Sequence, residues 1–131
     1  MADQELTQAD QNLEETIKDY LDAFDARDLS RCVGFYADNA VIHFMSGIYN
    51  ARPAIEEWHR DRFAANARIL SVDGIQVSGD KVAVDIVMTS DRFQAWKVDS
   101  ISARMNYEFQ NGKITEARYG LRATSSEIWR L

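Results

Sequence analysis

The side chains best suited to proton transfer in this chain are His59, Tyr20 and Tyr36. A histidine titrates at about pH 6.5, so His59 can act as a general acid or base near neutral pH. A tyrosine hydroxyl shielded from water can donate a hydrogen bond to an oxygen that gains negative charge. Each residue also has a structural interpretation, in which its polar atom is satisfied inside the core. The residue types leave both interpretations open.

His43 and Phe44 are neighbours in a run, residues 40–45, that favours a β-strand. A turn is predicted before it at residues 37–39, and Gly47 and Asn50 are expected to close the strand. Side chains alternate between the two faces of a strand, so only one of the pair can face the core. We expect Phe44 to face inward and His43 outward; a register shift of one residue would exchange them. The single cysteine, Cys32, lies in an apolar helical pattern and is predicted to be a buried thiol.

The pattern of ligating residues predicts no metal and no cofactor. The two histidines, His43 and His59, fall on different predicted elements and do not have the spacing of metal ligands. The six glycines occur singly and do not form a loop that could cradle phosphates. Any chemistry is therefore expected to come from the side chains themselves.

Charge and hydropathy limit the partners of the chain. With 15 Lys+Arg against 21 Asp+Glu the formal net charge is −6, which argues against binding to a phosphate backbone. The polar, acidic residues 1–15 do not resemble a signal peptide, and no apolar run is long enough to cross a membrane. We expect a cytoplasmic protein with no nucleic-acid partner and no membrane partner.

Three helices are predicted in the first half of the chain. The first carries apolar residues three and four positions apart, at Leu13, Ile17, Tyr20, Leu21 and Phe24. A second, short helix follows Asp28 as its N-cap. Pro53 suits the first turn of a third helix, on which His59 lies one turn after Ile55.

The second half is predicted to form an antiparallel sheet. Strands are expected at about residues 69–77 and 81–93, at 101–109, where apolar and polar residues alternate, and at 113–122. Asn111-Gly112 is a strong hairpin signal between the last two strands. The fold class is therefore α+β, with three N-terminal helices packed on a curved sheet. Residues 1–131 are predicted to form one domain with its core at 13–123. A polar extension at 1–12 precedes the core, and a short tail at 124–131 follows it, with a helix expected at 125–131.

Several stretches resemble the SnoaL-like and nuclear transport factor two-like superfamily. They are Tyr20-x-x-Ala23-Phe24-x-Ala26-x-Asp28-Leu29, Phe35-Tyr36-Ala37-Asp38-Asn39-Ala40, Gly47, Ala54-Ile55 and Phe109-x-Asn111-Gly112-Lys113-Ile114 with Arg118. The resemblance implies a cone-shaped fold around a pocket and a homodimer that pairs through the sheet face. It does not imply one activity, because the superfamily hosts isomerases, dehydratases, cyclases, hydrolases and non-enzymes.

Within this superfamily the chain is distantly similar to ketosteroid isomerase, which uses an aspartate base and an oxyanion hole made of a tyrosine and a neutral aspartic acid. The resemblance assigns Tyr20 to the oxyanion tyrosine, and Tyr36 and His59 to positions of supporting tyrosines. Phe44 and Met105 occupy the positions of the two carboxylates. Ketosteroid isomerisation by that mechanism is therefore not expected.

These observations predict a pocket that binds a small, largely apolar molecule. Its expected lining is Phe44, Trp58, Met88, Met105, Tyr107 and Phe109. The predicted function is a cofactor-free isomerase, dehydratase or cyclase, in which His59 moves a proton while Tyr20, with Tyr36 behind it, donates to the developing oxyanion. The alternative is a non-catalytic ligand-binding or dimerisation module with the same fold.

Overall fold

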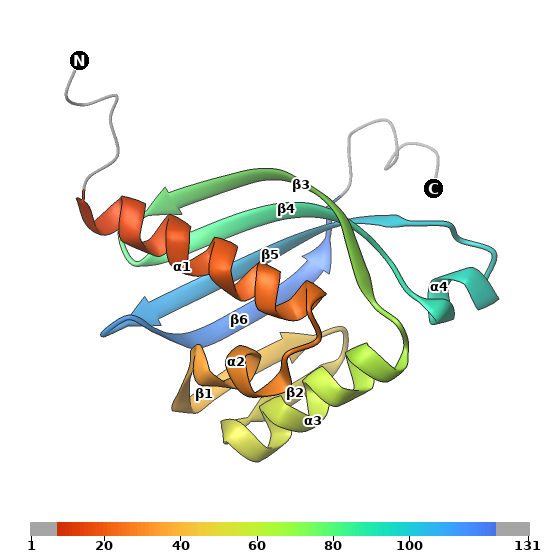
Figure 1. The fold of residues 1–131 in the computed structure, drawn as a ribbon, viewed down its shortest axis with the longest axis horizontal. Coiled ribbons are helices and arrows are strands. Elements are labelled where there is room, and N and C mark those ends of the chain that lie inside the picture. Colours follow the sequence, from red (N-terminus) through yellow and green to blue (C-terminus); the bar gives the residue numbers. More distant parts are fainter. Residues whose placement is uncertain (1–7, 123–131) are drawn as a thin grey trace.

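The computed structural model describes residues 8–122, which form helices and a single sheet (Figure 1). The helices are α1 (Gln8–Asp25), α2 (Leu29–Gly34), α3 (Ala51–Ala64) and α4 (Asp91–Ala95). The strands are β1 (Tyr36–Phe44), β2 (Gly47–Asn50), β3 (Arg68–Ser78), β4 (Lys81–Thr89), β5 (Ile101–Gln110) and β6 (Lys113–Leu121). The predicted α+β class and the three N-terminal helices are confirmed.

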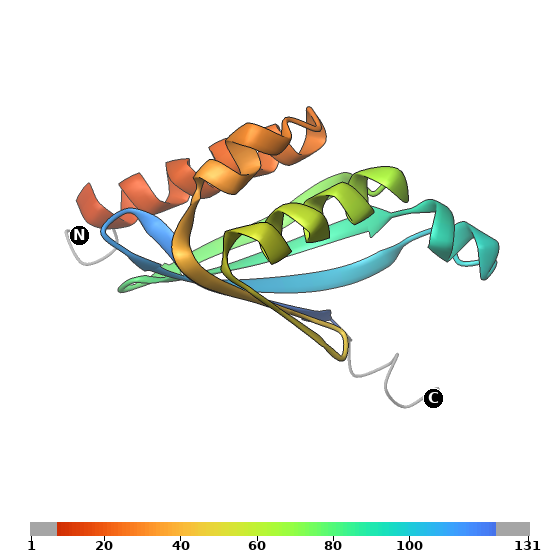
Figure 2. The ribbon, with the colours of Figure 1, turned by 90° about the horizontal axis from the view of Figure 1, so that it is seen from below.

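The sheet has the order β2-β1-β6-β5-β4-β3, and every neighbouring pair is antiparallel except β1 and β6. Figure 2 shows the open sheet curving beneath α1, α2 and α3, which all lie on its concave side. Twist and curvature of this kind let one sheet wrap around a helical layer. The core therefore lies between the concave face and the helices.

Local sequence signals explain where the helices begin and what they bury. The helical repeat in α1 places Ile17, Tyr20 and Leu21 against the sheet, each at most 6% exposed. The Asp28 side chain accepts a hydrogen bond from the backbone N–H of Arg31 at 3.2 Å, which confirms the predicted N-cap of α2. These two features explain which face of α1 is buried and where α2 begins.

The structure corrects three local predictions. The predicted turn at residues 37–39 lies inside β1, where the pairing with β6 shifts between Tyr36 and Val41, so that the chain bulges and stays extended. Residues 47–50 form the additional strand β2. The strand predicted to reach residue 93 ends at Thr89, because Ser90 caps α4 by accepting a hydrogen bond from the N–H of Phe93.

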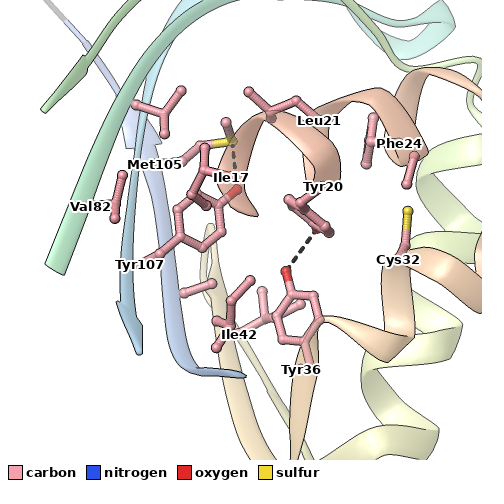
Figure 3. Close-up of a cluster of buried hydrophobic side chains, with 14 of the residues drawn as sticks. Ile17, Tyr20, Leu21, Phe24, Cys32, Tyr36, Ile42, Val82, Met105 and Tyr107 are labelled. Carbon is pink, nitrogen blue, oxygen red and sulfur yellow. Dashed lines mark hydrogen bonds between the residues drawn. The ribbon is translucent and has the colours of Figure 1, made fainter. Parts of the chain in front are cut away.

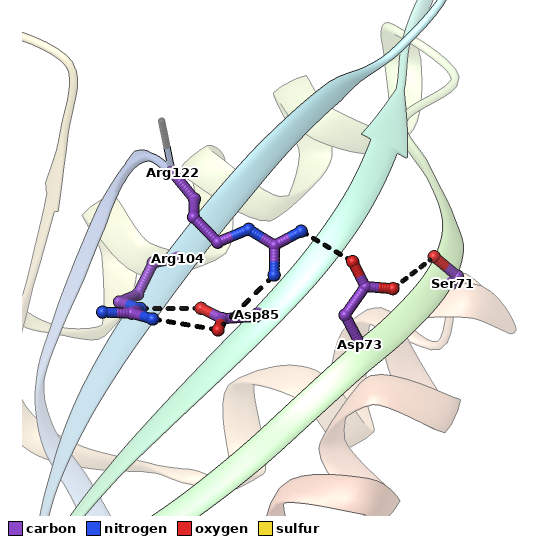
Figure 4. Close-up of polar contacts among 5 residues, drawn as sticks. All are labelled: Ser71, Asp73, Asp85, Arg104 and Arg122. Carbon is purple, nitrogen blue, oxygen red and sulfur yellow. Dashed lines mark hydrogen bonds and ion pairs between the residues drawn. The ribbon is translucent and has the colours of Figure 1, made fainter. Parts of the chain in front are cut away.

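The two faces of the sheet differ in polarity. On β5 the side chains of Ala103, Met105, Tyr107 and Phe109 are buried, as the alternating pattern predicts. On the opposite face, Arg104 donates two hydrogen bonds to Asp85 at 2.7 and 2.9 Å (Figure 4). Figure 4 also shows Arg122 reaching Asp73 and Asp85. Exposed pairs of this kind contribute little to stability, because water screens the attraction between the charges.

Two further predictions concern the ends of the chain and the membrane. The helical tail at 125–131 and most of the polar extension at 1–12 lie outside the described residues. Among the helices that the structure describes, none is long and apolar enough to span a bilayer.

Candidate functional site

The structure brings the three predicted catalytic residues into one hydrogen-bonded group. Tyr20 comes from α1, Tyr36 begins β1 and His59 lies in α3, and each is at most 1% exposed. The Tyr20 hydroxyl lies 2.8 Å from the Tyr36 hydroxyl and 2.8 Å from His59 Nε2. Figure 3 shows Tyr20 and Tyr36 meeting inside the core. Residues far apart in sequence therefore converge on one phenolic oxygen.

The protonation of His59 determines the direction of these hydrogen bonds. His59 Nδ1 lies 2.8 Å from the carbonyl oxygen of Ile55, which can only accept, so Nδ1 carries a hydrogen. Burial lowers the pKa of His59 to about 4, so the imidazole is neutral at pH 7 and Nε2 holds a lone pair. Tyr20 therefore donates to His59, and Tyr36 donates to Tyr20.

A second pair of tyrosines adjoins the first group. Tyr107 donates to the sulfur of Met105 at 3.3 Å, and its oxygen lies 3.1 Å from the Tyr119 hydroxyl, so Tyr119 donates to Tyr107. The Tyr119 oxygen is also 3.4 Å from that of Tyr20 and 3.5 Å from that of Tyr36. We refer to Tyr20, Tyr36, His59, Tyr107 and Tyr119 as the tyrosine–histidine cluster.

All four tyrosines of the cluster are neutral donors at neutral pH. Burial raises the pKa of Tyr20, Tyr36 and Tyr107 well above 10, and it also raises that of Tyr119. The neighbouring phenols add to the effect on the first three, because a second negative charge in the cluster would be repelled. The cluster can therefore supply hydrogen bonds, but it does not hold a resident anion.

Tyr119 was not among the predicted site residues, and a β-bulge explains why. The hairpin pairs Gln110 with Lys113, and a ladder continued without a break would place Arg118 opposite Met105. The register shifts between Glu108 and Phe109, and Tyr119 takes that place instead. The bulge therefore turns the Tyr119 hydroxyl toward the cluster while Arg118 stays exposed.

A small inner cavity of about 30 Å³ adjoins the cluster. Its walls are Tyr20, Leu21, Phe24, Phe44, Trp58, Arg62, Ile69, Ile86, Met88, Met105, Tyr107 and Tyr119. A volume of about 10–15 Å³ accepts one water, so the space is large enough only for a small group or for the end of a larger ligand. His59 and Tyr36 lie behind Tyr20 and are not on the wall. Phe109 is packed in the core and also does not line the cavity.

Residues 17–117 match the family described as the SnoaL-like domain. The chain belongs to this family. SnoaL-like domains are part of the nuclear transport factor two-like superfamily, so the resemblance noted from the sequence is confirmed. A comparison with curated proteins found no match.

Solved structures with the same fold have low sequence identity to this SnoaL-like domain. The epoxide hydrolase/cyclase-like enzyme SalBIII, described in pyran ring formation in the polyether salinomycin, has a TM-score of 0.77 and 19% identity over 92% of this chain and 97% of its own. A candidate polyketide cyclase from Sinorhizobium meliloti has a TM-score of 0.72 and 20% identity, covering 81% and 94% of the two chains. A candidate ketosteroid isomerase from Kribbella flavida has a TM-score of 0.73 and 11% identity, covering 87% and 80%. At these identities the likeness shows the fold alone.

In this SnoaL-like domain the inner cavity continues toward the surface in two steps. A middle hollow of about 60 Å³ is lined by Phe44, Met45, Arg62, Ala65, Ala67, Met88, Ser90, Arg92, Phe93 and Trp96. An outer groove of about 390 Å³ is lined by Phe44, Met45, Met88, Phe93, Trp96, Val98, Ile101, Ala103, Tyr119, Gly120 and Leu121. Phe44 and Met88 line all three spaces, which therefore adjoin one another.

The remaining polar candidates lie away from the cavity. His43 binds Glu116 at 2.9 Å on the outer face of the sheet, while Phe44 faces inward. Cys32 is buried, and burial raises the pKa of its thiol to about 12, which makes it unreactive at neutral pH. Among the described residues there is no cluster of three His, Cys, Asp or Glu that could hold a metal ion.

The walls of the three spaces contain no carboxylate among the residues that the structure describes. Phe44 and Met105, which take the carboxylate positions of ketosteroid isomerase in the resemblance, both line the inner cavity. The surface of the inner cavity is apolar, and the residues that line it carry their polar atoms behind that surface: the hydroxyls of Tyr20, Tyr107 and Tyr119, the guanidinium of Arg62 and the indole N–H of Trp58. The site therefore has hydrogen-bond donors next to an apolar cavity and has no aspartate base.

Proposed function

We propose that this SnoaL-like domain binds a small, largely apolar molecule by one acceptor oxygen and catalyses a cofactor-free isomerase, dehydratase or cyclase reaction on it. The observation that carries the proposal is the pair of hydroxyls of Tyr20 and Tyr119, which lie 3.4 Å apart on two residues that line an apolar cavity. Donors fixed in a site of low polarity stabilise a developing oxyanion far better than water does.

Tyr119 is the donor that can turn toward a ligand at least cost. The Tyr20 hydrogen is held by His59 at 2.8 Å, whereas Tyr119 makes a longer bond of 3.1 Å to Tyr107. When Tyr119 turns away, Tyr107 keeps its bond to the sulfur of Met105. We therefore assign Tyr119 to the substrate oxygen that gains charge.

Tyr20 and His59 can take up the proton that the reaction releases. If a substrate hydroxyl attacks a carbonyl or an epoxide carbon, its proton passes to the Tyr20 oxygen as Tyr20 passes its own to His59 Nε2. Tyr119 meanwhile gives its proton to the leaving or carbonyl oxygen. The low pKa of His59, about 4, favours the return of that proton through Tyr20 to Tyr119, which restores all three groups. Tyr36 keeps the Tyr20 oxygen in place.

The test measures ring closure of short hydroxy-epoxides by chiral gas chromatography. Removing one oxyanion donor typically costs about 10²–10³ in kcat, so Tyr119→Phe is expected to lose that much. His59→Gln is expected to lose at least about 10², because the amide can still accept a hydrogen bond from Tyr20 but cannot take up its proton. His43→Gln on the outer face is the matched control and should keep the wild-type rate. A Tyr119→Phe protein with full kcat would refute the assignment.

The second candidate function is a non-catalytic ligand-binding or dimerisation module. It is favoured by the absence of a carboxylate from the described walls of the cavity. We propose that two copies pair through the outer face of the sheet, where Arg104 and Arg118 alternate with acidic partners. Light scattering that returns 15.0 kDa at micromolar concentration would refute the dimer. Binding of the hydroxy-epoxides without turnover would favour this module over the enzyme.

A further inference from the structure

Arg62 is a buried cation at the junction of the inner cavity and the middle hollow. It lies on α3 one turn after Trp58 and is 7% exposed. Its guanidinium carbon lies 4.4 Å from the centroid of the Phe44 ring and 5.5 Å from that of Trp58. Both rings line the inner cavity, so the charge is held against aromatic faces at the entrance to the tyrosine–histidine cluster.

The Arg62 guanidinium makes no hydrogen bond and no ion pair with the residues that the structure describes. Buried arginines are almost always paired with an acceptor, because losing water without one is costly. Trp58 Nε1 is a fully buried donor without a partner among the same residues, and Trp58 is 2% exposed. A nearly buried cation and a buried N–H group, both unpaired among these residues, therefore belong to residues that line one cavity whose described walls hold no carboxylate.

The surroundings of Arg62 also favour an anion. Burial lowers the pKa of Arg62, and the charge of Arg92, an exposed residue that lines the same middle hollow, lowers it further. A negative group placed there would relieve the repulsion between the two cations and replace the water that Arg62 has lost. Guanidinium forms two parallel hydrogen bonds with a carboxylate, which makes a carboxylate the best match.

Beyond Arg62, the outer groove offers an apolar surface. Met45, Trp96 and Leu121 are 78%, 64% and 75% exposed, and all three line this groove of about 390 Å³. Exposed apolar surface that leads to a charged group matches a molecule with a polar head and a hydrocarbon body. The inner cavity and the middle hollow are too small for such a body, so the body must lie in the groove.

We propose that the ligand of this domain is an amphiphilic carboxylate, whose head binds the Arg62 guanidinium with Trp58 Nε1 as a second donor and whose hydrocarbon body lies in the outer groove. The inference rests on the proposed function, because it names the substrate class of the same cavity. The carboxylate anchors the molecule, and the oxygen next to Tyr119 is a second polar group further along it.

The test compares octanoate with octanamide, which has the same chain length and no charge, by isothermal titration at pH 7.5. Losing one partner of a buried charged pair is costly, so we expect octanoate to bind the wild-type protein at least about tenfold more tightly than octanamide. Arg62→Gln should reduce that preference to about twofold or less, and Arg62→Lys should keep part of it. Arg60→Gln, on the exposed side of the same helix, should leave the preference unchanged.

The wild-type comparison remains decisive even if Arg62→Gln fails to fold. Equal affinity for the two probes, or no binding of either, would overturn the carboxylate site, as would a preference that survives in a folded Arg62→Gln protein. Near-UV circular dichroism establishes whether the variant is folded. A shift of the Arg62 side-chain N–H resonance on adding octanoate, and none on adding octanamide, is the expected independent signature.

A neutral probe separates this proposal from the proposed function. If 2-octanone binds and Tyr119→Phe weakens its binding, while octanoate is not preferred over octanamide, the donor site stands and the carboxylate site fails. If octanoate binds through Arg62 while Tyr119→Phe keeps full kcat in ring closure, the carboxylate site stands and the proposed reaction fails.

Discussion

The tyrosine–histidine cluster, here the closed end of the site, and the part formed by Arg62, Trp58 and the outer groove, here its open end, differ in how completely their polar groups are satisfied. At the closed end, Tyr20, Tyr36, Tyr107 and His59 are essentially buried and each has a hydrogen-bond partner. At the open end, Trp58 Nε1 is buried without one among the described residues, and Arg62, which is 7% exposed, makes no side-chain hydrogen bond with them. A satisfied network stabilises and orients its members, whereas unsatisfied donors destabilise the free protein.

The difference indicates which end supports the fold and which end receives a ligand. Proteins keep destabilising groups at sites where binding or catalysis depends on them. The exposed apolar residues of the outer groove fit the same division, because burying them on folding would close the entrance. The two ends should therefore respond in opposite ways to substitution.

The largest expected effect is on the free energy of unfolding, and it is seen by replacing one aromatic residue at each end. Tyr36→Ala removes a side chain that is 0% exposed and strips Tyr20 of its donor, so it should lower the free energy of unfolding by about 3–5 kcal/mol. Trp96→Ala, in the outer groove, should change it by no more than about 0.5 kcal/mol. Urea unfolding followed by circular dichroism measures both. Similar losses would abolish the contrast between the ends.

The next effect depends on pH and concerns the two histidines. The pKa of His59 is about 4 in the folded protein and about 6.5 when unfolded, so the unfolded state binds more protons between these values. Stability therefore falls as the pH drops through this window, by about 2–3 kcal/mol at pH 4.5 relative to pH 7.

The His59→Gln protein should lack this part of the pH dependence, and the His43→Gln protein should retain it. Comparing the variants at each pH removes the contribution of the carboxylates that they share. Parallel pH profiles for wild type and His59→Gln would show that His59 is not held in its neutral form by the fold.

The smallest expected effect is a gain of stability at the open end. Arg62→Met replaces an unpaired buried cation with an apolar side chain, which should raise the free energy of unfolding of the ligand-free protein by about 0.5–2 kcal/mol. Arg60→Met, on the exposed side of α3, should change it by less than about 0.5 kcal/mol. A clear loss of stability in Arg62→Met would mean that stacking on Phe44 and Trp58 outweighs the cost of burying the charge.

Much of the fold was predictable because its signals are local. The helical repeat from Leu13 to Phe24, the N-cap at Asp28 and the Asn111-Gly112 hairpin each depend on residues close in sequence. The local signals predicted the wrong element where one residue suited two different structures. Ser90 could extend a strand or cap a helix, and the structure shows that the cap prevails.

The sequence by itself determined the α+β class, the helix faces and the residue types available for chemistry, because period and capping act within a few residues. Only the tertiary structure decided which donors meet. The bulge in the last hairpin brought Tyr119 to Tyr20, and the packing of α3 left Arg62 without a partner among the described residues. Both outcomes depend on shifts of one residue or a few ångströms between distant segments, and no local pattern encodes distances of that kind.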